Sequence, residues 1–116
     1  MITLVVAHTG QLDPAALVAA RSLLEGVFEG EFTDHDWEHS LGGVHALTWA
    51  GSELIGHASL IQRRILHRGR ALRTGYVEGV GVRADVRRCG HASAMMTALE
   101  RVAAAAYELG ALGATD

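Results

Sequence analysis

The chain has 116 residues, of which 49% are hydrophobic, so it is large enough for one hydrophobic core and too small for two. We therefore expect a single domain over residues 1–116. The lone cysteine, Cys89, excludes an internal disulfide, and no Cys/His cluster has the spacing of a structural zinc site, which fits a reducing, cytoplasmic location. No apolar run approaches the roughly 20 residues that span a bilayer, so we expect no membrane partner.

The net charge is only −3 at pH 7, but the charges are unevenly distributed. Every basic residue is an arginine, and all except Arg21 lie between Arg63 and Arg101. The acids concentrate in an earlier run without Lys or Arg, which consists of Glu25, Glu29, Glu31, Asp34, Asp36 and Glu38. Such a run attracts a cationic partner, although a solvated acidic loop explains it equally well.

The N-terminal part predicts one strand followed by two helices. Ile2 to His8 is an apolar run typical of a strand. Asp13-Pro14 then supplies the N-cap and first residue of a helix that stops near Gly26 and buries Leu17, Val18, Ala20 and Leu24. Thr33 begins a second, short helix, which Gly42 and Gly43 end. Thr33-Asp34-His35-Asp36 has the form of a capping box.

Three strands and a long helix follow. Residues 44–50, 53–67 and 71–82, separated by short turns, predict an antiparallel meander. From about Gly90 to Leu109 the apolar residues form one helical stripe, so this helix is expected to pack on the sheet. Residues 110–116 resemble the start of another strand. The fold class is thus α/β (α+β), with a mixed, mostly antiparallel sheet and flanking helices.

The stretch between the last meander strand and the long helix carries the clearest functional signal. In the strand, Thr74, Tyr76, Glu78, Val80 and Val82 alternate with Gly75, Val77, Gly79 and Gly81. Glycines inside a strand indicate a bulge or a ligand that runs beside the backbone. The turn that follows, Arg87 to Ala92, fits R/Q-x-x-G-x-G/A, whose backbone N–H groups and helix N-terminus favour an anion. A solvated turn with a glycine before a helix is the simpler alternative.

Three other motifs are rejected. His35-Asp36-Trp37-Glu38-His39 spells the inverted zincin pattern H-x-x-E-H, but Gly42 and Gly43 cut the helix too short for a metal site. Residues 79–84 spell G-x-G-x-x-A, yet they follow a meander strand rather than open a βαβ unit. The arginines of residues 63–73 suggest nucleic acid, but no aromatic platform lies among them and the net charge is negative.

The strand, turn and helix of residues 75–100 resemble the acetyl-coenzyme A motif of the GNAT superfamily of N-acetyltransferases. The resemblance narrows with the strings Asp36-Trp37-Glu38-His39, Leu41 to Leu47, Ile61 to Arg64 and Gly75 to Val80. In order and spacing these strings are similar to the bacterial aminoglycoside 2′-N-acetyltransferases, over about residues 4 to 113. The resemblance implies a GNAT fold, acetyl-CoA as cosubstrate, a cationic aminoglycoside or related amine as substrate, and direct transfer in a ternary complex.

The resemblance also implies roles for individual residues. Glu78 is the expected catalytic residue, as a substrate ligand and as a base acting through ordered water. The expected substrate-binding set is Glu31, Asp36, Glu78 and Gly79. The expected cofactor-binding set comprises Val80, Gly81 and Val82 along the pantetheine arm and Arg87, Arg88, Cys89, Gly90, His91 and Ala92 around the pyrophosphate. Alternatives stay open: Glu78 as a strand carboxylate that faces solvent or pairs with Arg73 or Arg83, and Asp36 as a helix cap.

The end of the chain departs from the family pattern. Members of the family continue through a further helix and two strands, which carry a tyrosine that protonates the leaving thiolate, so we expect a C-terminally truncated domain with an exposed sheet edge. Gly113 stands where related enzymes have a serine. Two other functions therefore remain open: acetyl transfer to another amine, or a non-catalytic domain that binds coenzyme A. The resemblance further implies a homodimer.

Overall fold

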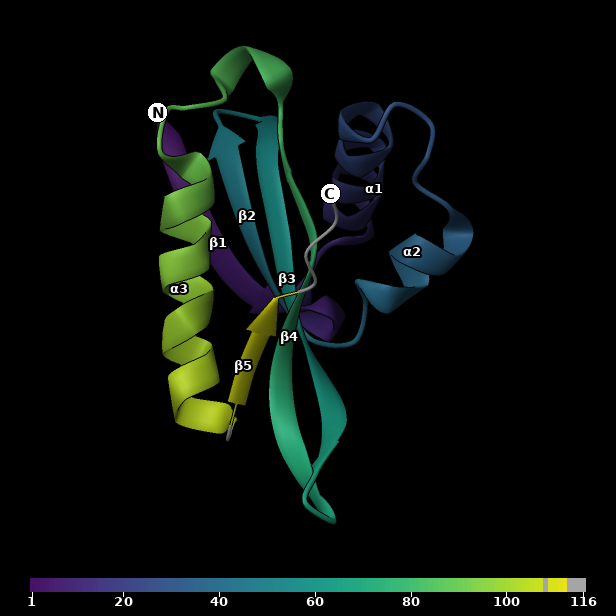
Figure 1. The fold of residues 1–116 in the computed structure, drawn as a ribbon. Helices are drawn as coiled ribbons and strands as arrows, with labels where there is room; N and C mark the ends of the chain where they lie inside the picture. Colours follow the sequence, from purple (N-terminus) through teal and green to yellow (C-terminus); the bar gives the residue numbers. More distant parts are fainter. Residues whose placement is uncertain (108, 113–116) are drawn as a thin grey trace.

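The computed structural model describes residues 1–107 and 109–112, and these form one mixed sheet covered by helices (Figure 1). The strands are β1 (Ile2–His8), β2 (Val44–Ala50), β3 (Glu53–His67), β4 (Arg70–Val82) and β5 (Leu109–Leu112). They lie in the order β1-β2-β3-β4-β5, antiparallel from β1 to β4, with β5 parallel to β4. The helices are α1 (Pro14–Val27), α2 (Asp34–His39) and α3 (His91–Ala106), with 3-10 turns at Thr9–Gln11 and Ala84–Val86. The mixed, mostly antiparallel sheet with flanking helices confirms the predicted fold class.

Local capping explains where the first two helices begin. Asp13 accepts a hydrogen bond from the Ala15 amide, and Pro14 occupies the first turn of α1, where a missing N–H costs nothing. At α2, Thr33 Oγ1 accepts from the Asp36 amide, and Asp36 Oδ2 accepts from the Thr33 amide. Both caps were predicted from the sequence, because a cap depends on residues only a few positions apart.

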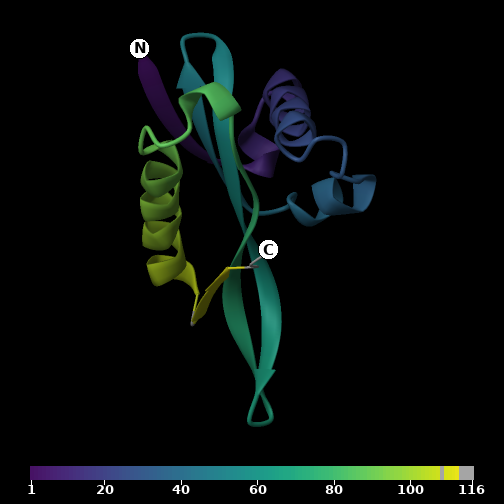
Figure 2. The same cartoon turned by 45° about the horizontal axis from the view of Figure 1, so that its top comes forward.

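Two apolar clusters lie on opposite faces of the sheet. Figures 1 and 2 show α3 over one face and α1 with α2 over the other. The α3-side cluster contains Ala46, Ala58, Leu60, Val77, Met95 and Leu99, and the α1-side cluster contains Ala20, Leu47 and Leu54. Successive residues of β2, Ala46 and Leu47, thus serve opposite clusters, as the alternation of a strand requires. The prediction for α1 was wrong at Val18, which is 66% exposed.

The long helix is shorter than expected. α3 ends at Ala106 rather than Leu109, because Tyr107 has an extended backbone (φ −126°, ψ 152°) that leads into β5. Tyr107 also packs against the α3-side cluster. Within the described residues, none of the helices is both long enough and apolar enough to cross a membrane.

A β-bulge in β4 changes which side chains share a face. Ser59 pairs with Glu78 and His57 with Gly81, so two residues of β4 lie opposite the single residue between Ser59 and His57. The bulge contains Gly79, whose φ of +56° is a left-handed conformation that glycine adopts at little cost. The glycines of this strand indicated a bulge or a ligand beside the backbone, and the structure shows the bulge.

The bulge overturns the strict alternation expected for residues 74–82. Before it, a Cβ on Gly75 would meet Tyr107, on the α3 side of the sheet. After it, a Cβ on Gly81 would meet Leu24 of α1, on the opposite side. Glu78 therefore does not share a face with Val80 and Val82, which pack against the α3-side cluster. The extra residue shifts the side-chain period by one, so every later side chain changes face.

Candidate active site on the two sides of the bulge

A pocket of about 180 Å³ lies between β4 and the α1–α2 region, and we call it the acidic pocket. Its acids are Glu31, Asp36 and Glu78, and Phe28 and Phe32 supply apolar wall. The full lining consists of Phe28, Glu31, Phe32, Asp36, Ser40, Val77, Glu78, Gly79 and Val80. All four residues predicted to bind substrate thus line one pocket. Three carboxylates beside two aromatic rings suit an organic cation.

The rest of the acidic run is partly neutralised. Arg21 of α1 forms ion pairs with Glu25 and Asp34, which raise the pKa of its guanidinium. Sequence spacing did not show this contact, since Arg21 lies outside the run. Glu31 and Asp36, the two acids of the run that line the acidic pocket, are not among the ion-pair partners of Arg21.

Asp36 both caps a helix and lines the acidic pocket. Its hydrogen bonds with the backbone and side chain of Thr33 lower the pKa of its carboxyl group. The carboxylate is exposed and, once ionised, can meet a cation through its remaining lone pairs. The two readings of Asp36 left open by the sequence are therefore compatible, because the cap holds the charge at the pocket.

Glu78 is half-buried and has a neighbouring cation. Arg63 of β3 places Nη2 3.5 Å from Glu78 Oε1, and the same nitrogen donates to the His39 carbonyl at 3.4 Å. The alternatives left open by the sequence were a carboxylate that faces solvent or one that pairs with Arg73 or Arg83. Arg83 instead bonds Glu53 and Asp85, and Arg73 donates to the Ala106 carbonyl. Glu78 therefore lines the acidic pocket and has Arg63 as its ion-pair partner.

A second pocket, of about 200 Å³, lies at the turn into α3, and we call it the loop pocket. Its lining consists of Val82, Val86, Arg87, Arg88, Gly90, His91, Ala92 and Ser93. Six of the nine residues predicted to bind cofactor are among them. Of the other three, Val80 lines the acidic pocket, Gly81 is buried against α1, and Cys89 is exposed as a free thiol.

Within the part of the chain that the structure describes, no side chain caps the N-terminus of α3, which lies at the loop pocket. α1 and α2 have side-chain caps, whereas Gly90, the N-cap of α3, makes no such hydrogen bond. Gly90 has φ +86° and Arg88 has φ +65°, so the turn uses two left-handed residues to present its backbone. Free N–H groups and the positive end of the helix dipole favour an anion here.

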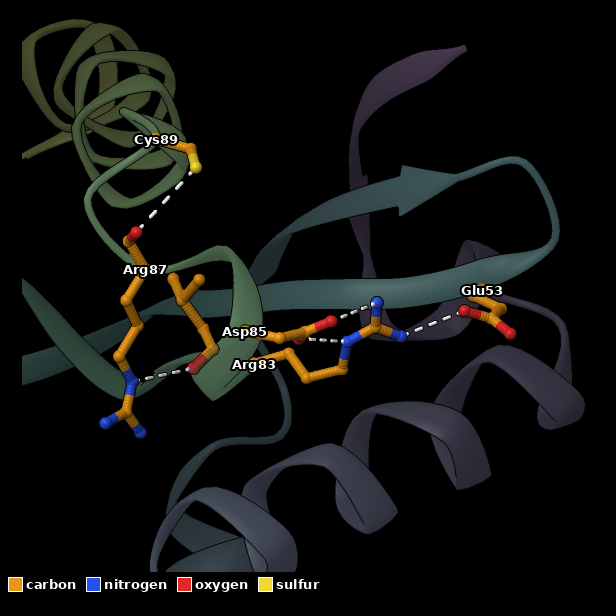
Figure 3. Close-up of polar contacts among 6 residues, drawn as sticks. Glu53, Arg83, Asp85, Arg87 and Cys89 are labelled. Atoms are coloured by element: carbon orange, nitrogen blue, oxygen red, sulfur yellow. Dashed lines mark hydrogen bonds and ion pairs between the residues drawn. The ribbon is translucent and has the colours of Figure 1, made fainter.

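Three arginines around the turn, Arg83, Arg87 and Arg88, differ in the bonds that their side chains make. Arg83 forms a bidentate pair with Asp85 and a further bond to Glu53, shown in Figure 3. This network raises the pKa of Arg83 and lowers that of Asp85, and it ties the 3-10 turn to β3. Arg87 Nε donates to the Val82 carbonyl, and Cys89 Sγ donates to the Arg87 carbonyl (Figure 3). Arg88 is exposed and makes no side-chain bond within the described residues, which leaves its charge for a ligand.

Sequence reasoning missed two buried histidines beside the bulge. His45 of β2 and His57 of β3 are both 0% exposed, and His57 Nδ1 lies 2.7 Å from the Gly79 carbonyl oxygen. Their positions inside predicted strands were the available signal, since a histidine on an inward position needs a polar partner. Among residues 1–107 and 109–112, no group of three or more His, Cys, Asp or Glu side chains could hold a metal ion.

Residues 11–116 match the family described as Acetyltransferase (GNAT) domain. The chain therefore belongs to the GNAT acetyltransferases. The aminoglycoside 2′-N-acetyltransferase of Mycolicibacterium fortuitum is 51% identical over 109 residues, which make up 94% of this chain and 56% of that relative. The chain thus spans just over half the length of that curated relative.

Solved structures share the fold. A Trypanosoma brucei acetyltransferase aligns with a TM-score of 0.68 at 19% identity, over 100% of this chain and 84% of its own. The aminoglycoside N-acetyltransferase AAC(6′)-Iy in complex with CoA aligns with a TM-score of 0.73 at 18% identity, over 99% and 78%. Gly113, expected to replace a serine that contacts substrate, lies outside the described residues.

Proposed function

We propose that the protein transfers an acetyl group from acetyl-CoA to the 2′-amino group of an aminoglycoside. The observation that carries the proposal is the 51% identity to an aminoglycoside 2′-N-acetyltransferase over 94% of this chain. The geometry supports it, because β4 joins an acidic pocket at Glu78 to a loop pocket at Val82, four residues later. A cation and an anion bound there lie on one strand.

The loop pocket suits the pyrophosphate of acetyl-CoA. The uncapped N-terminus of α3 offers N–H donors, and Arg88 offers a charge that no described residue neutralises. Gly90, His91 and Ala92 would hold the phosphates. Val82 in the loop pocket and Val80 in the acidic pocket would lie along the rest of the cofactor. When bound, acetyl-CoA supplies a thioester whose carbonyl carbon accepts the amine.

The acidic pocket suits the ammonium groups of the substrate. Glu31 and Asp36 would hold amino groups away from the reaction, while Glu78 accepts the proton that the reacting amine must lose. In the reaction the nitrogen–carbon bond forms, the carbon–sulfur bond breaks, and coenzyme A leaves. A base of this kind accelerates such reactions by about 10² to 10⁴.

We also infer a cytoplasmic location and a homodimer. A cytoplasmic location agrees with the exposed free thiol of Cys89, which a reducing compartment preserves. A homodimer follows from the resemblance alone. Acetyl transfer to a different amine is the second candidate, since the acidic pocket would also accept other polyamines.

The test is thiol release from acetyl-CoA with two matched substrates. One aminoglycoside carries a 2′-amino group, and its close analogue carries a 2′-hydroxyl. Release with the amine alone supports the proposal, and release with both contradicts the 2′ position. If neither substrate releases thiol while simple polyamines do, the second candidate replaces the first. A Glu78→Gln variant should lose at least about a hundredfold in kcat.

A further inference from the structure

A continuous chain of hydrogen bonds crosses the sheet and ends at the bulge. The Gly42 amide donates to Thr9 Oγ1 at 2.9 Å, and Thr9 Oγ1 lies 2.6 Å from His45 Nε2. His45 Nδ1 lies 2.8 Å from His57 Nε2, and His57 Nδ1 lies 2.7 Å from the Gly79 carbonyl oxygen. The chain therefore connects the 3-10 turn after β1 to β4 through both buried imidazoles.

The last hydrogen bond of the series, at the Gly79 carbonyl, fixes the direction of all the others. A carbonyl oxygen only accepts, so His57 Nδ1 carries hydrogen and donates to Gly79. In a neutral ring Nε2 is then bare and accepts from His45 Nδ1–H. His45 Nε2 is bare in turn and accepts from the Thr9 hydroxyl. Burial favours these neutral rings, because it lowers the pKa of both histidines from 6.5 to about 4.

The bulge that receives the last bond separates the two pockets. Glu78 precedes Gly79 and lines the acidic pocket, whereas Val82 follows it and lines the loop pocket. Gly79 needs a left-handed backbone, which a single donor to its carbonyl can hold in place. A shift of this peptide would turn Glu78 relative to the strand that follows.

We propose that Thr9, His45 and His57 form a one-way hydrogen-bond relay that fixes the Gly79 carbonyl, so that both histidines act as positioning residues for Glu78. The effect on catalysis rests on the proposed function, whereas the relay itself does not. The relay makes a specific demand, since both histidines must be neutral with the hydrogen on Nδ1. Free histidine has no partner that imposes this form.

The first experiment measures the tautomers in the full chain labelled with ¹⁵N. Ring nitrogen spectra at pH 7 should show Nδ1–H with a bare Nε2 for His45 and for His57. An Nε2–H tautomer or an imidazolium at either position overturns the relay. This result does not depend on any enzymatic activity, so an inactive protein still decides the question.

The second experiment compares two substitutions of His57. Asn places an amide N–H₂ near the position of Nδ1 and keeps a donor for Gly79, whereas Leu removes it. Amide hydrogen exchange over residues 78–82 should stay close to wild type in His57→Asn and speed up in His57→Leu. Thr48→Val is the control, because Thr48 is buried on β2 with no hydrogen-bond partner for its hydroxyl among the described residues. Equal exchange in the Asn and Leu variants contradicts the proposal.

The third experiment measures the steady-state kinetics of the same two His57 variants. The KM for the aminoglycoside should rise about tenfold or more in His57→Leu, a loss on the scale of one buried hydrogen bond, and should be largely restored in His57→Asn. The KM for acetyl-CoA should change less. Equal KM values for the aminoglycoside in all three proteins contradict the positioning role. If His57→Leu fails to fold, the tautomer measurement on the wild type still tests the relay.

Discussion

Arg63 Nη2 lies 3.5 Å from Glu78 Oε1 across the β3–β4 pair, so a cation of β3 lies beside the proposed base, which lines the acidic pocket. Both side chains are partly exposed, at 36% and 26%. Water therefore screens the pair, and it adds little to stability. Its consequence is for binding, because a cationic substrate must compete with Arg63 for the same carboxylate.

Replacing Arg63 by Gln should strengthen binding of the cationic substrate. The gain should be modest, about two- to fivefold in KM, which matches the worth of an exposed ion pair. Steady-state kinetics at low and high salt measure it, and the gain should shrink at high salt, where charges are screened. Arg64→Gln is the matched control on the neighbouring position. A higher KM in Arg63→Gln would show that Arg63 supports binding instead.

Replacing Arg88 by Ala should weaken the binding of acetyl-CoA and leave the binding of the aminoglycoside unchanged. A hydrogen bond to a charged group is worth about 1.5–3 kcal/mol, so the KM for acetyl-CoA should rise at least about tenfold. Arg101→Ala, an exposed arginine further along α3, is the control. Titration calorimetry with coenzyme A gives the same comparison without turnover. Equal affinity of the two variants for coenzyme A would show that Arg88 does not contribute to its binding.

The local parts of the fold and the antiparallel meander of β2, β3 and β4 were predicted from the sequence, whereas contacts that depend on the exact strand register were not. The caps at Asp13 and Thr33 depend on neighbours within three residues, so their spacing revealed them. The bonds from His45 to His57 and from His57 to Gly79 depend on the register of three strands. No spacing in one sequence fixes that register, so the two histidines did not stand out.

The bulge shows the same limit inside a single strand. Its glycines predicted a bulge, but the position of the extra residue decides which side chains share a face. The alternative partners considered for Glu78, Arg73 and Arg83, did not include the arginine that the structure places beside it. Arg63 reaches it from the neighbouring strand, and the arginines near Glu78 in sequence bond elsewhere.

Substituting Gly79 by Ala should destabilise the protein by about 1–2 kcal/mol through its left-handed backbone alone. A Cβ would also lie 2.7 Å from Ser40 Oγ, which adds a clash. Combining Gly79→Ala with Ser40→Ala should remove the clash with the hydroxyl and leave the backbone cost together with the loss of the Ser40 Oγ hydrogen bond to the Asp36 carbonyl, which Ser40→Ala alone measures. Gly26→Ala is the opposite control, because Gly26 lies in α1 with open space around it. Urea unfolding should show Gly26→Ala more stable by about 0.5–1 kcal/mol. If Gly79→Ala leaves the free energy of unfolding unchanged, residue 79 does not require the left-handed backbone described for the bulge.

Thr48→Val should stabilise the protein. The Thr48 hydroxyl is buried and, among the described residues, has no hydrogen-bond partner. An unsatisfied buried polar group costs about 1–3 kcal/mol, and valine has nearly the same shape without that group. Urea unfolding should therefore show a gain of about 1 kcal/mol with an unchanged m-value. A loss of stability would indicate that the hydroxyl has a bound partner such as water.

The buried histidines should make the protein less stable in mild acid. In the folded state burial lowers the pKa of His45 and His57 to about 4, while the unfolded chain keeps a pKa near 6.5. The unfolded state therefore binds more protons between these values, so stability is full above pH 6.5 and is lost as the pH falls toward 4. Asp36 and Asp85 have lowered pKa values and lose their contribution to stability only in stronger acid.

Urea unfolding should show a clearly lower free energy of unfolding at pH 5 than at pH 7, with a smaller difference in His57→Asn. His8→Asn tests how much the nearby His8 contributes to the lowered pKa of His45. Equal stability of the wild type at both pH values would mean that the two imidazoles are not held neutral.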